Sequence, residues 1–301
     1  MTSADEYTDF ARAHLPRSLA EKWISLLHPA VQFPHDLAPG EAPALVLGGA
    51  PLMPDGVGWP ALEGYGPLSF IAELDCAAVA AVGGLDLLPT SGYLLFFCAD
   101  HRYDGVDQDV DFLEQITAWT QGRALYVAPD TPRSARQAPE GLEPYGTKQH
   151  PARAVSTPPY AGHELAERYF GSEVVALMDR QVEALRFGGP APADAICPLW
   201  AEAFEYGIHD LREGFCQTGG HSRPAQGPVE LEAARDALDR RGNAQVTDVL
   251  DETEHWRVLF QTADDEDIDL MWGGGSVGYW MIREDDLAAR RFDRIWFTMQ
   301  N

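Results

Sequence analysis

The residues best suited to chemistry form an acidic run near the end of the chain, where five of six consecutive positions carry a carboxylate. These residues are Asp264, Asp265, Glu266, Asp267 and Asp269. Carboxylate oxygens bind hard cations, but a calcium loop that began at Asp265 would need a glycine where Leu270 stands and a glutamate where Ser276 stands. We therefore predict a solvated acidic turn and no metal site.

A tryptophan and three glycines follow the acidic run, in the order Met271-Trp272-Gly273-Gly274-Gly275. Glycines let another molecule approach the backbone closely. An aromatic side chain beside carboxylates is typical of a surface that docks a cationic partner. Two interpretations follow: Trp272 anchors a partner, or it folds back into the core, as large aromatic side chains commonly do.

Other reactive side chains give weaker patterns. Cys216 and His221 are five residues apart, but no third group that would orient them is identifiable. The nine histidines show no metal-binding spacing. The prolines of residues 48–54 remove the amide donors that a phosphate cradle requires. We predict no metal ion, no zinc site and no cofactor.

Three carboxylates form the basis of an enzyme hypothesis. Glu73 and Asp75 project to one face of an expected strand, and Asp100 follows the neighbouring strand. Such carboxylates could serve as a general acid and base in a cleft. The alternative is that these carboxylates at strand ends are solvent-exposed and have no catalytic role.

The charge balance excludes several partners. The 301 residues contain 22 basic and 47 acidic side chains, which gives a formal net charge of −25. Such a surface repels nucleic acids and anionic lipid heads. No apolar run approaches the ~20 residues that cross a bilayer, and the acidic first ten residues do not resemble a signal peptide. The four cysteines lack disulfide spacing, so we expect a cytoplasmic protein with reduced thiols.

The apolar patterns predict mostly strands, with helices at the start and in the middle of the chain. Alternating or continuous apolar runs predict strands at residues 44–47, 68–74, 93–98, 123–128, 256–261, 277–282 and 294–299. Apolar positions three and four apart predict helices in residues 1–30, 174–187 and 228–241, and a short helix begins near 284.

We expect one domain, residues 1–301, with halves at 1–128 and 164–301 that a proline-rich surface segment, 129–163, connects. The two halves show a weak internal sequence similarity: residues 67–75 resemble residues 258–265, and residues 92–97 resemble residues 278–282. Each half gives a strand that runs into an acidic turn, and then an aromatic strand after a glycine. This similarity suggests two pseudo-equivalent β-units, although short aromatic strands commonly look alike.

Most of the chain resembles the YwqG-like family, bacterial proteins that contain a domain of unknown function. The resemblance is carried by LGGAPLMPDGVGWP (47–60), PLSFIAELD (67–75), LFQTADD (259–265), MWGGG (271–275), YWMIR (279–283) and IWFTMQ (295–300). It implies a β-rich α+β roll and supplies no catalytic residues. The occurrence of such proteins near toxin genes suggests an antitoxin or immunity role by association. The chain departs from the family pattern in the shortened segment after His221 and at Gly274, where an acid is usual.

The sequence therefore predicts an α+β, β-rich roll of mixed or antiparallel sheets with peripheral helices. We expect a non-enzymatic, immunity-like protein that neutralises a basic protein partner. The binding face would comprise the 264–269 turn and Trp272, with the Asp104–Asp111 turn beside them. The alternative is a small-molecule-binding or hydrolytic enzyme with a carboxylate-lined cleft between the halves.

Overall fold

The computed structural model of the chain describes residues 8–9, 12, 17–35, 37–83, 85–86, 88–104, 118–157, 168, 171, 215–242 and 246–301. Its secondary structure is β-rich, and every strand pair in its sheets is antiparallel. In these residues, no helix combines the length and the apolar character needed to span a membrane.

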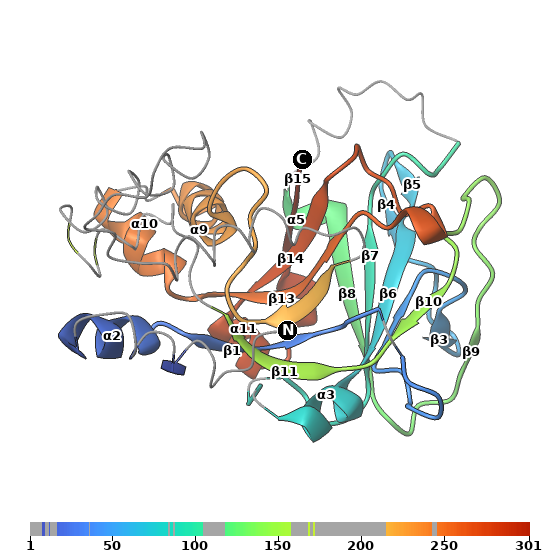
Figure 1. Ribbon diagram of the computed structural model, residues 1–301. Coiled ribbons are helices and arrows are strands. Elements are labelled where there is room, and N and C mark those ends of the chain that lie inside the picture. The colour runs from blue at the N-terminus through green and yellow to red at the C-terminus, as the bar shows by residue number, and fades with distance from the viewer. Residues whose placement is uncertain are drawn as a thin grey trace.

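The larger sheet has six strands and combines both ends of the chain (Figure 1). From edge to edge its strands are β11 (Arg153–Thr157), β1 (His28–Gln32), β12 (Cys216–Gly219), β13 (Trp256–Ala263), β14 (Val277–Arg283) and β15 (Trp296–Gln300). The last three are neighbours in sequence and in space, whereas β1 comes from the start of the chain and β11 from the proline-rich segment.

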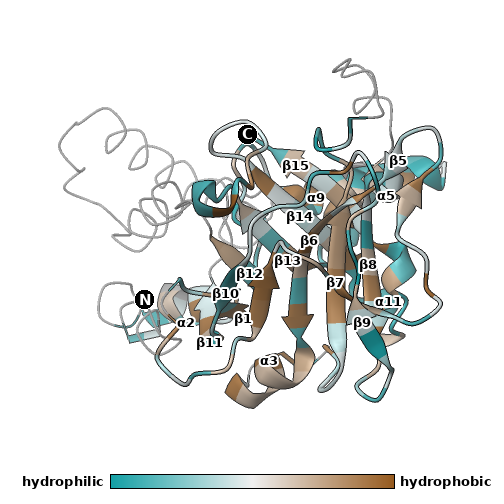
Figure 2. Ribbon diagram, turned by 90° about the vertical axis from the view of Figure 1, so that its right-hand side faces the viewer, coloured by the Kyte–Doolittle hydropathy of each residue, from teal (hydrophilic) through white to brown (hydrophobic). Residues whose placement is uncertain are grey.

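The smaller sheet has five strands, all within residues 45–150. In order they are β10 (Lys148–His150), β2 (Leu45–Leu47), β6 (Ser69–Asp75), β7 (Tyr93–Cys98) and β8 (Gly122–Val127). Two small two-stranded sheets accompany it, namely β3 (Leu52–Pro54) with β9 (Arg133–Ala135) and β4 (Ala61–Leu62) with β5 (Gly66–Pro67). Figure 2 shows β7 as hydrophobic along most of its length, which agrees with its burial on both faces.

Helices lie at the periphery of the two sheets, as the sequence predicts. They are α2 (Arg17–Ile24), α3 (Cys76–Val82), α5 (Ala118–Gln121), α9 (Val229–Arg240), α10 (Val246–Thr253) and α11 (Glu284–Ala288), with short 3-10 turns η1 (Glu266–Ile268) and η2 (Phe292–Arg294). Figure 1 shows α9 and α10 on one side of the six-stranded sheet and the five-stranded sheet on the other. Buried residues of α9 pack there against Val258, Tyr279 and Trp296.

The main core lies between the two large sheets. Phe96 of β7 stacks on Phe260 of β13, with ring centroids 4.6 Å apart and an angle of 19° between the ring planes. Trp280 of β14 contacts both of these rings and Phe297 of β15. Its indole N–H donates to the carbonyl of Phe97 at 3.1 Å, which pairs this buried polar atom across the sheets. The α+β architecture of packed antiparallel sheets is therefore confirmed.

The strand pairs with similar sequences, β6–β7 and β13–β14, occupy corresponding positions in the two large sheets. Counted from the edge strands β8 and β15, β7 and β14 are second and β6 and β13 are third. Both pairs contain a register shift, near Ile71 in one and Leu259 in the other. A pair of glycines with positive φ stands at the end of each next strand: Gly48-Gly49 directly follows β2, and Gly219-Gly220 begins at the last residue of β12. This is the arrangement that a duplication predicts.

The structure also differs from the sequence prediction in several elements. The seven predicted strands are present: β7 has the predicted bounds, and the other six differ by one or two residues at one or both ends. The predicted helix of residues 1–30 is described only as α2, and residues 28–32 form strand β1 instead. The proline-rich segment contains β9, β10 and β11, three strands that the sequence analysis did not predict. The predicted helix at 174–187, Cys197 and Asp107–Asp111 lie outside the described residues.

Candidate functional site

The acidic run forms the turn between β13 and β14, and its first carboxylate is buried. Asp264 is 3% exposed and accepts hydrogen bonds from the backbone N–H groups of Trp272, Gly274 and Ser276 at 3.0, 3.0 and 3.1 Å. A carboxylate with three such donors holds the loop 271–276 in place. The prediction of a solvated turn is wrong for this residue, because the glycine-rich loop folds over it.

Asp265 is also buried, and it is paired with a lysine from the other large sheet. It is 1% exposed, and its Oδ2 lies 2.8 Å from Nζ of Lys148 on β10. Its Oδ1 accepts the backbone N–H of Asp267 at 3.1 Å, which caps η1. Partial burial lowers the pKa of Lys148, but the hydrogen bonds and charges of Asp265 and Asp267 outweigh burial and leave it raised.

The last two carboxylates of the run point outward, above cations that are mostly covered. The side chains of Asp267 and Asp269 are 79% and 69% exposed, whereas their partners Lys148 and Arg102 are 20% and 17% exposed. The ion-pair distances are 2.8 Å for Lys148 and 2.5 Å for Arg102. The hydrogen bond from Lys148 lowers the pKa of Asp267. Glu266 is exposed as well.

A second acidic segment adjoins this turn. The backbone of Asp104 donates to Gly141 at 2.9 Å and that of Glu143 donates to Arg102 at 3.3 Å, so residues 102–104 and 141–143 run side by side. Arg102 links this pair of segments to Asp269. Asp104, Glu140 and Glu143 are all exposed. We call the exposed carboxylates of the two segments the acidic rim: Asp104, Glu140, Glu143, Glu266, Asp267 and Asp269.

Trp272 folds back onto the protein, as the second interpretation predicts. The residue is half-buried, and its side chain packs against the core between the sheets. A Cβ atom added at Gly278 would lie 3.0 Å from the Trp272 ring, so this glycine leaves room for it. The neighbouring loop contributes Met271 as the exposed apolar side chain, at 38%.

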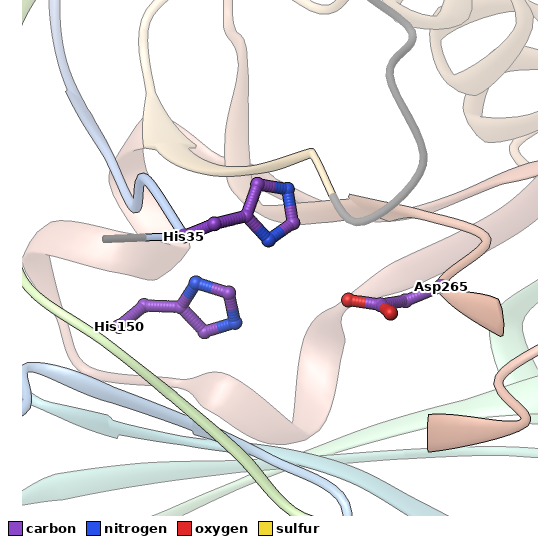
Figure 3. A group of neighbouring side chains, drawn as sticks. All are labelled: His35, His150 and Asp265. Atoms are coloured by element: carbon purple, nitrogen blue, oxygen red, sulfur yellow. The ribbon is translucent and has the colours of Figure 1, made fainter. Parts of the chain in front are cut away.

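Two histidines that the sequence analysis did not select lie beside Asp265 (Figure 3). One potential ligand atom each of His35, His150 and Asp265 lies within 4.8 Å of the others. Figure 3 shows the Asp265 carboxylate directed toward the two imidazole rings. His35 lies just after β1, His150 ends β10, and Asp265 follows β13, so the packing of the two large sheets creates this group.

His150 has a defined tautomer and an unused nitrogen. Its Nδ1 lies 3.0 Å from the carbonyl oxygen of Pro34, an acceptor, so Nδ1 carries the proton. Its Nε2 is buried and has no hydrogen-bond partner. Burial lowers the pKa of His150, and this effect outweighs the hydrogen bond to Pro34. The imidazole is therefore neutral, with a lone pair on Nε2.

The three carboxylates of the enzyme hypothesis serve separate interactions. Glu73 forms an ion pair with Nη1 of Arg133 at 2.8 Å, although burial raises the pKa of Glu73. Asp75 caps α3 by accepting the N–H groups of residues 77 and 78. Asp100 accepts hydrogen bonds from the hydroxyl groups of Ser69 and Tyr145, both at 2.6 Å. Asp75 and Ser69 are at opposite ends of β6, so the structure does not bring Asp75 and Asp100 together.

Cys216 and His221 are also separated, by the length of β12. Cys216 is buried, its Sγ lies 3.2 Å from Oγ1 of Thr262, and burial raises its pKa to about 12. His221 stacks on His28, with ring centroids 4.0 Å apart. In the described residues, the two side chains therefore have different neighbours and do not form a catalytic pair.

A pocket of about 280 Å³ lies near the His28–His221 stack. It is lined by His28, Pro29, Leu85, Asp86, Leu88, Gly219, Gly220, Arg257, Val258, Glu284 and Leu287. Both halves of the chain contribute to it, and two of the lining groups are carboxylates. Burial, with the neighbouring His221 and Arg257, lowers the pKa of His28 to about 3, so its ring is neutral at pH 7.

Comparison with known proteins identifies the chain only at the level of its domain. The family model described as "Domain of unknown function (DUF1963)" matches residues 46–300. No curated protein matches the chain.

Proposed function

Because the chain belongs to the family of the domain of unknown function DUF1963, we propose its role from the site: it is a non-enzymatic binding protein that captures a basic protein partner. The acidic rim is the binding face. We also propose that the chain is a bacterial, YwqG-like protein with an immunity or antitoxin role, and that it acts in the cytoplasm. Cys76, Cys98 and Cys216 are buried and form no disulfide with one another, which supports a reducing compartment.

The observation that carries this proposal is the layering of charge at the rim. Two mostly covered cations hold the outward-pointing carboxylates in place: Arg102 pairs with Asp269, and Lys148 pairs with Asp267. The cations are mostly covered, so a partner contacts the carboxylate oxygens of these ion pairs. A fixed carboxylate loses less side-chain entropy on binding than a freely rotating one, which favours association.

The net charge of −25 adds long-range attraction. A basic partner is steered toward an acidic protein at low ionic strength, and salt screens this attraction over a Debye length of ~8 to 10 Å. Arginine side chains of the partner are well suited to the rim because a guanidinium group binds a carboxylate through two parallel hydrogen bonds. The proposal therefore predicts association that is fast, salt-sensitive and localised.

The test uses an octa-arginine peptide as the probe and two charge-matched variants. The rim variant is Glu266→Gln, Asp267→Asn, Asp269→Asn. The control variant is Asp130→Asn, Asp239→Asn, Asp293→Asn, three exposed acids on other elements than the rim. We expect the rim variant to lose about tenfold in affinity at 0.15 M salt, from the loss of two or three weak ionic contacts, and the control to lose much less.

Equal losses in the two variants would mean that the peptide senses only net charge, and the rim would not be a binding face. Association rates that stay constant from low to high salt would contradict the steering step. Circular dichroism of both variants checks that the fold is intact.

A second candidate function, the binding of a small molecule, is favoured by the pocket beside His28. The pocket combines aliphatic side chains with His28, Asp86, Arg257 and Glu284, which suits a small ligand with an apolar body and a polar group. The Leu85→Trp substitution would fill it, whereas Val82→Trp places the same side chain at an exposed position on α3.

Native mass spectrometry of the purified protein tests this second function. We expect a bound small molecule in the unmodified chain and in Val82→Trp, and its absence in Leu85→Trp. A molecule retained in Leu85→Trp would place it elsewhere, and a chain purified without any bound molecule would count against this function.

A further inference from the structure

We propose that His35, His150 and Asp265 form a binding site for a divalent transition-metal ion, with Zn²⁺ as the best match. Two imidazole nitrogens and one carboxylate oxygen are a donor set that zinc accepts, and three protein ligands leave a fourth position for water or another molecule. Calcium and magnesium are disfavoured because they prefer oxygen ligands alone. This site is separate from the exposed carboxylates of the acidic rim.

His150 gives the clearest indication of a ligand. It is fully buried, its Nδ1–H donates to the carbonyl of Pro34, and its Nε2 has no partner. A buried acceptor without a partner is destabilising unless something supplies the missing bond. A histidine that binds a metal through one nitrogen typically donates its other N–H to a backbone carbonyl or a carboxylate. His150 already has this arrangement.

Asp265 supplies the negative charge. Its carboxylate is 1% exposed and is directed toward the two imidazoles (Figure 3). A buried carboxylate needs a cation nearby, because burial of an unpaired charge is strongly unfavourable. Lys148 already supplies one cation to Asp265, and a divalent ion between the carboxylate and the rings would add a doubly charged one and give His150 Nε2 its missing partner.

Metal binding requires the three ligand atoms to move closer together than they lie in this structure. The ligand atoms lie within 4.8 Å of one another, whereas a tetrahedral zinc ion with bonds of about 2.0 to 2.1 Å holds its ligand atoms about 3.3 Å apart. His35 is exposed, so its ring can move toward the other two ligands without disturbing the core. The same exposure gives the ion a path into the site.

Lys148 competes with the metal for Asp265. Its Nζ lies 3.1 and 2.8 Å from the two carboxylate oxygens of Asp265, and 2.8 Å from Oδ2 of Asp267. When a metal ion takes one oxygen of Asp265, Lys148 keeps its contact with Asp267. The proposal therefore predicts that removal of the lysine charge strengthens metal binding, and that this gain is lost when His35→Ala is combined with Lys148→Met, whereas a nonspecific acidic surface would keep it.

The test is a titration of the full-length chain with ZnCl₂ by calorimetry and with CoCl₂ by visible absorption, since Co²⁺ bound to nitrogen ligands in a four-coordinate site absorbs strongly. We expect one ion per chain. His35→Ala, which changes an exposed residue, and His150→Phe should each lower the affinity by about tenfold or more. Lys148→Met should raise it several-fold. The matched control is His255→Ala, an exposed histidine away from the site, which should bind as the unmodified chain does.

Three results would overturn the proposal: no binding of Zn²⁺ or Co²⁺ by the folded chain, equal affinity in His35→Ala and in the unmodified chain, or weaker binding in Lys148→Met when its circular dichroism spectrum is native. His35→Ala keeps the test decisive if His150→Phe fails to fold. Loss of metal binding without any change in binding of the octa-arginine peptide would separate this site from the proposed binding face.

Discussion

Lys148, on the edge strand of the five-stranded sheet, places its Nζ 2.8 Å from Oδ2 of the buried Asp265, which follows a strand of the six-stranded sheet. One ion pair therefore joins the two sheets at the acidic turn. Asp265 depends on it strongly, because this carboxylate is almost entirely removed from water.

Replacement of Lys148 by methionine should destabilise the protein. The change leaves the buried charge of Asp265 without its cation, so we expect the free energy of unfolding to fall by about 2 to 4 kcal/mol. This loss is near the lower end of the range for broken buried ion pairs, because Lys148 is partly exposed. Urea denaturation with a metal chelator present measures this. In the double variant Lys148→Met, Asp265→Asn, the loss should be smaller than the sum of the two single losses. Additive losses would mean that the pair does not interact.

Asp264→Ala should open the glycine-rich loop. The substitution removes the acceptor of three backbone N–H groups, of which that of Ser276 is buried, and we expect a loss of about 3 kcal/mol in the free energy of unfolding. The exposed neighbour serves as the control, since Glu266→Ala should change stability by about 0.5 kcal/mol or less. Hydrogen exchange should show faster exchange of the amides of residues 272–276 in Asp264→Ala. Unchanged exchange there would contradict the anchoring role.

Acid should destabilise the folded chain below about pH 6.5, in part through His28. The pKa of His28 is lowered from 6.5 to about 3 in the folded state, so between these values the unfolded chain binds a proton that the folded chain does not. Stability therefore falls as the pH falls, by at most about 1.4 kcal/mol per pH unit for one such group, and is insensitive to His28 above pH 6.5. Denaturation between pH 6.5 and 5 measures this slope. His28→Phe, which keeps a ring against His221, should reduce the slope, and the exposed His255→Phe should not.

Phe260→Ala should weaken the contact between the two large sheets. Phe260 is fully buried and stacks on Phe96, so its removal leaves a cavity and should lower the free energy of unfolding by about 3 to 5 kcal/mol. Leu52→Ala, at a side chain that is 37% exposed, should cost less than about 1 kcal/mol. Similar effects of the two substitutions, measured by denaturant melting, would mean that the core does not lie between the sheets.

The sequence predicts those strands whose burial depends on their own apolar residues. β7 is apolar at every position except Tyr93, and it was predicted at its observed bounds. β12 was missed because Gln217 and Thr218 are polar, yet both are fully buried. Gln217 donates to the carbonyls of Gly219 and His221, and Thr218 donates to that of Leu259. Such strands depend on partners that no local pattern reveals.

The site could be located in the sequence but not understood from it. The acidic run identifies the turn, whereas the burial of Asp265 depends on Lys148, which is 117 residues away. No sequence spacing predicts His35 and His150 as neighbours of this turn, because each is more than one hundred residues from the next ligand. Their approach results from the pairing of β10 with β2 and from the packing of the two sheets.

The six-stranded sheet takes β1 and β11 from residues 28–157 and its other four strands from residues 216–300. A polypeptide cleaved between β11 and β12 would thus yield two fragments, each with an unfinished sheet and part of the shared core. Because the two fragments share one core, we expect them to associate when they are mixed. A proteolytic nick between these strands would leave the two pieces bound to each other.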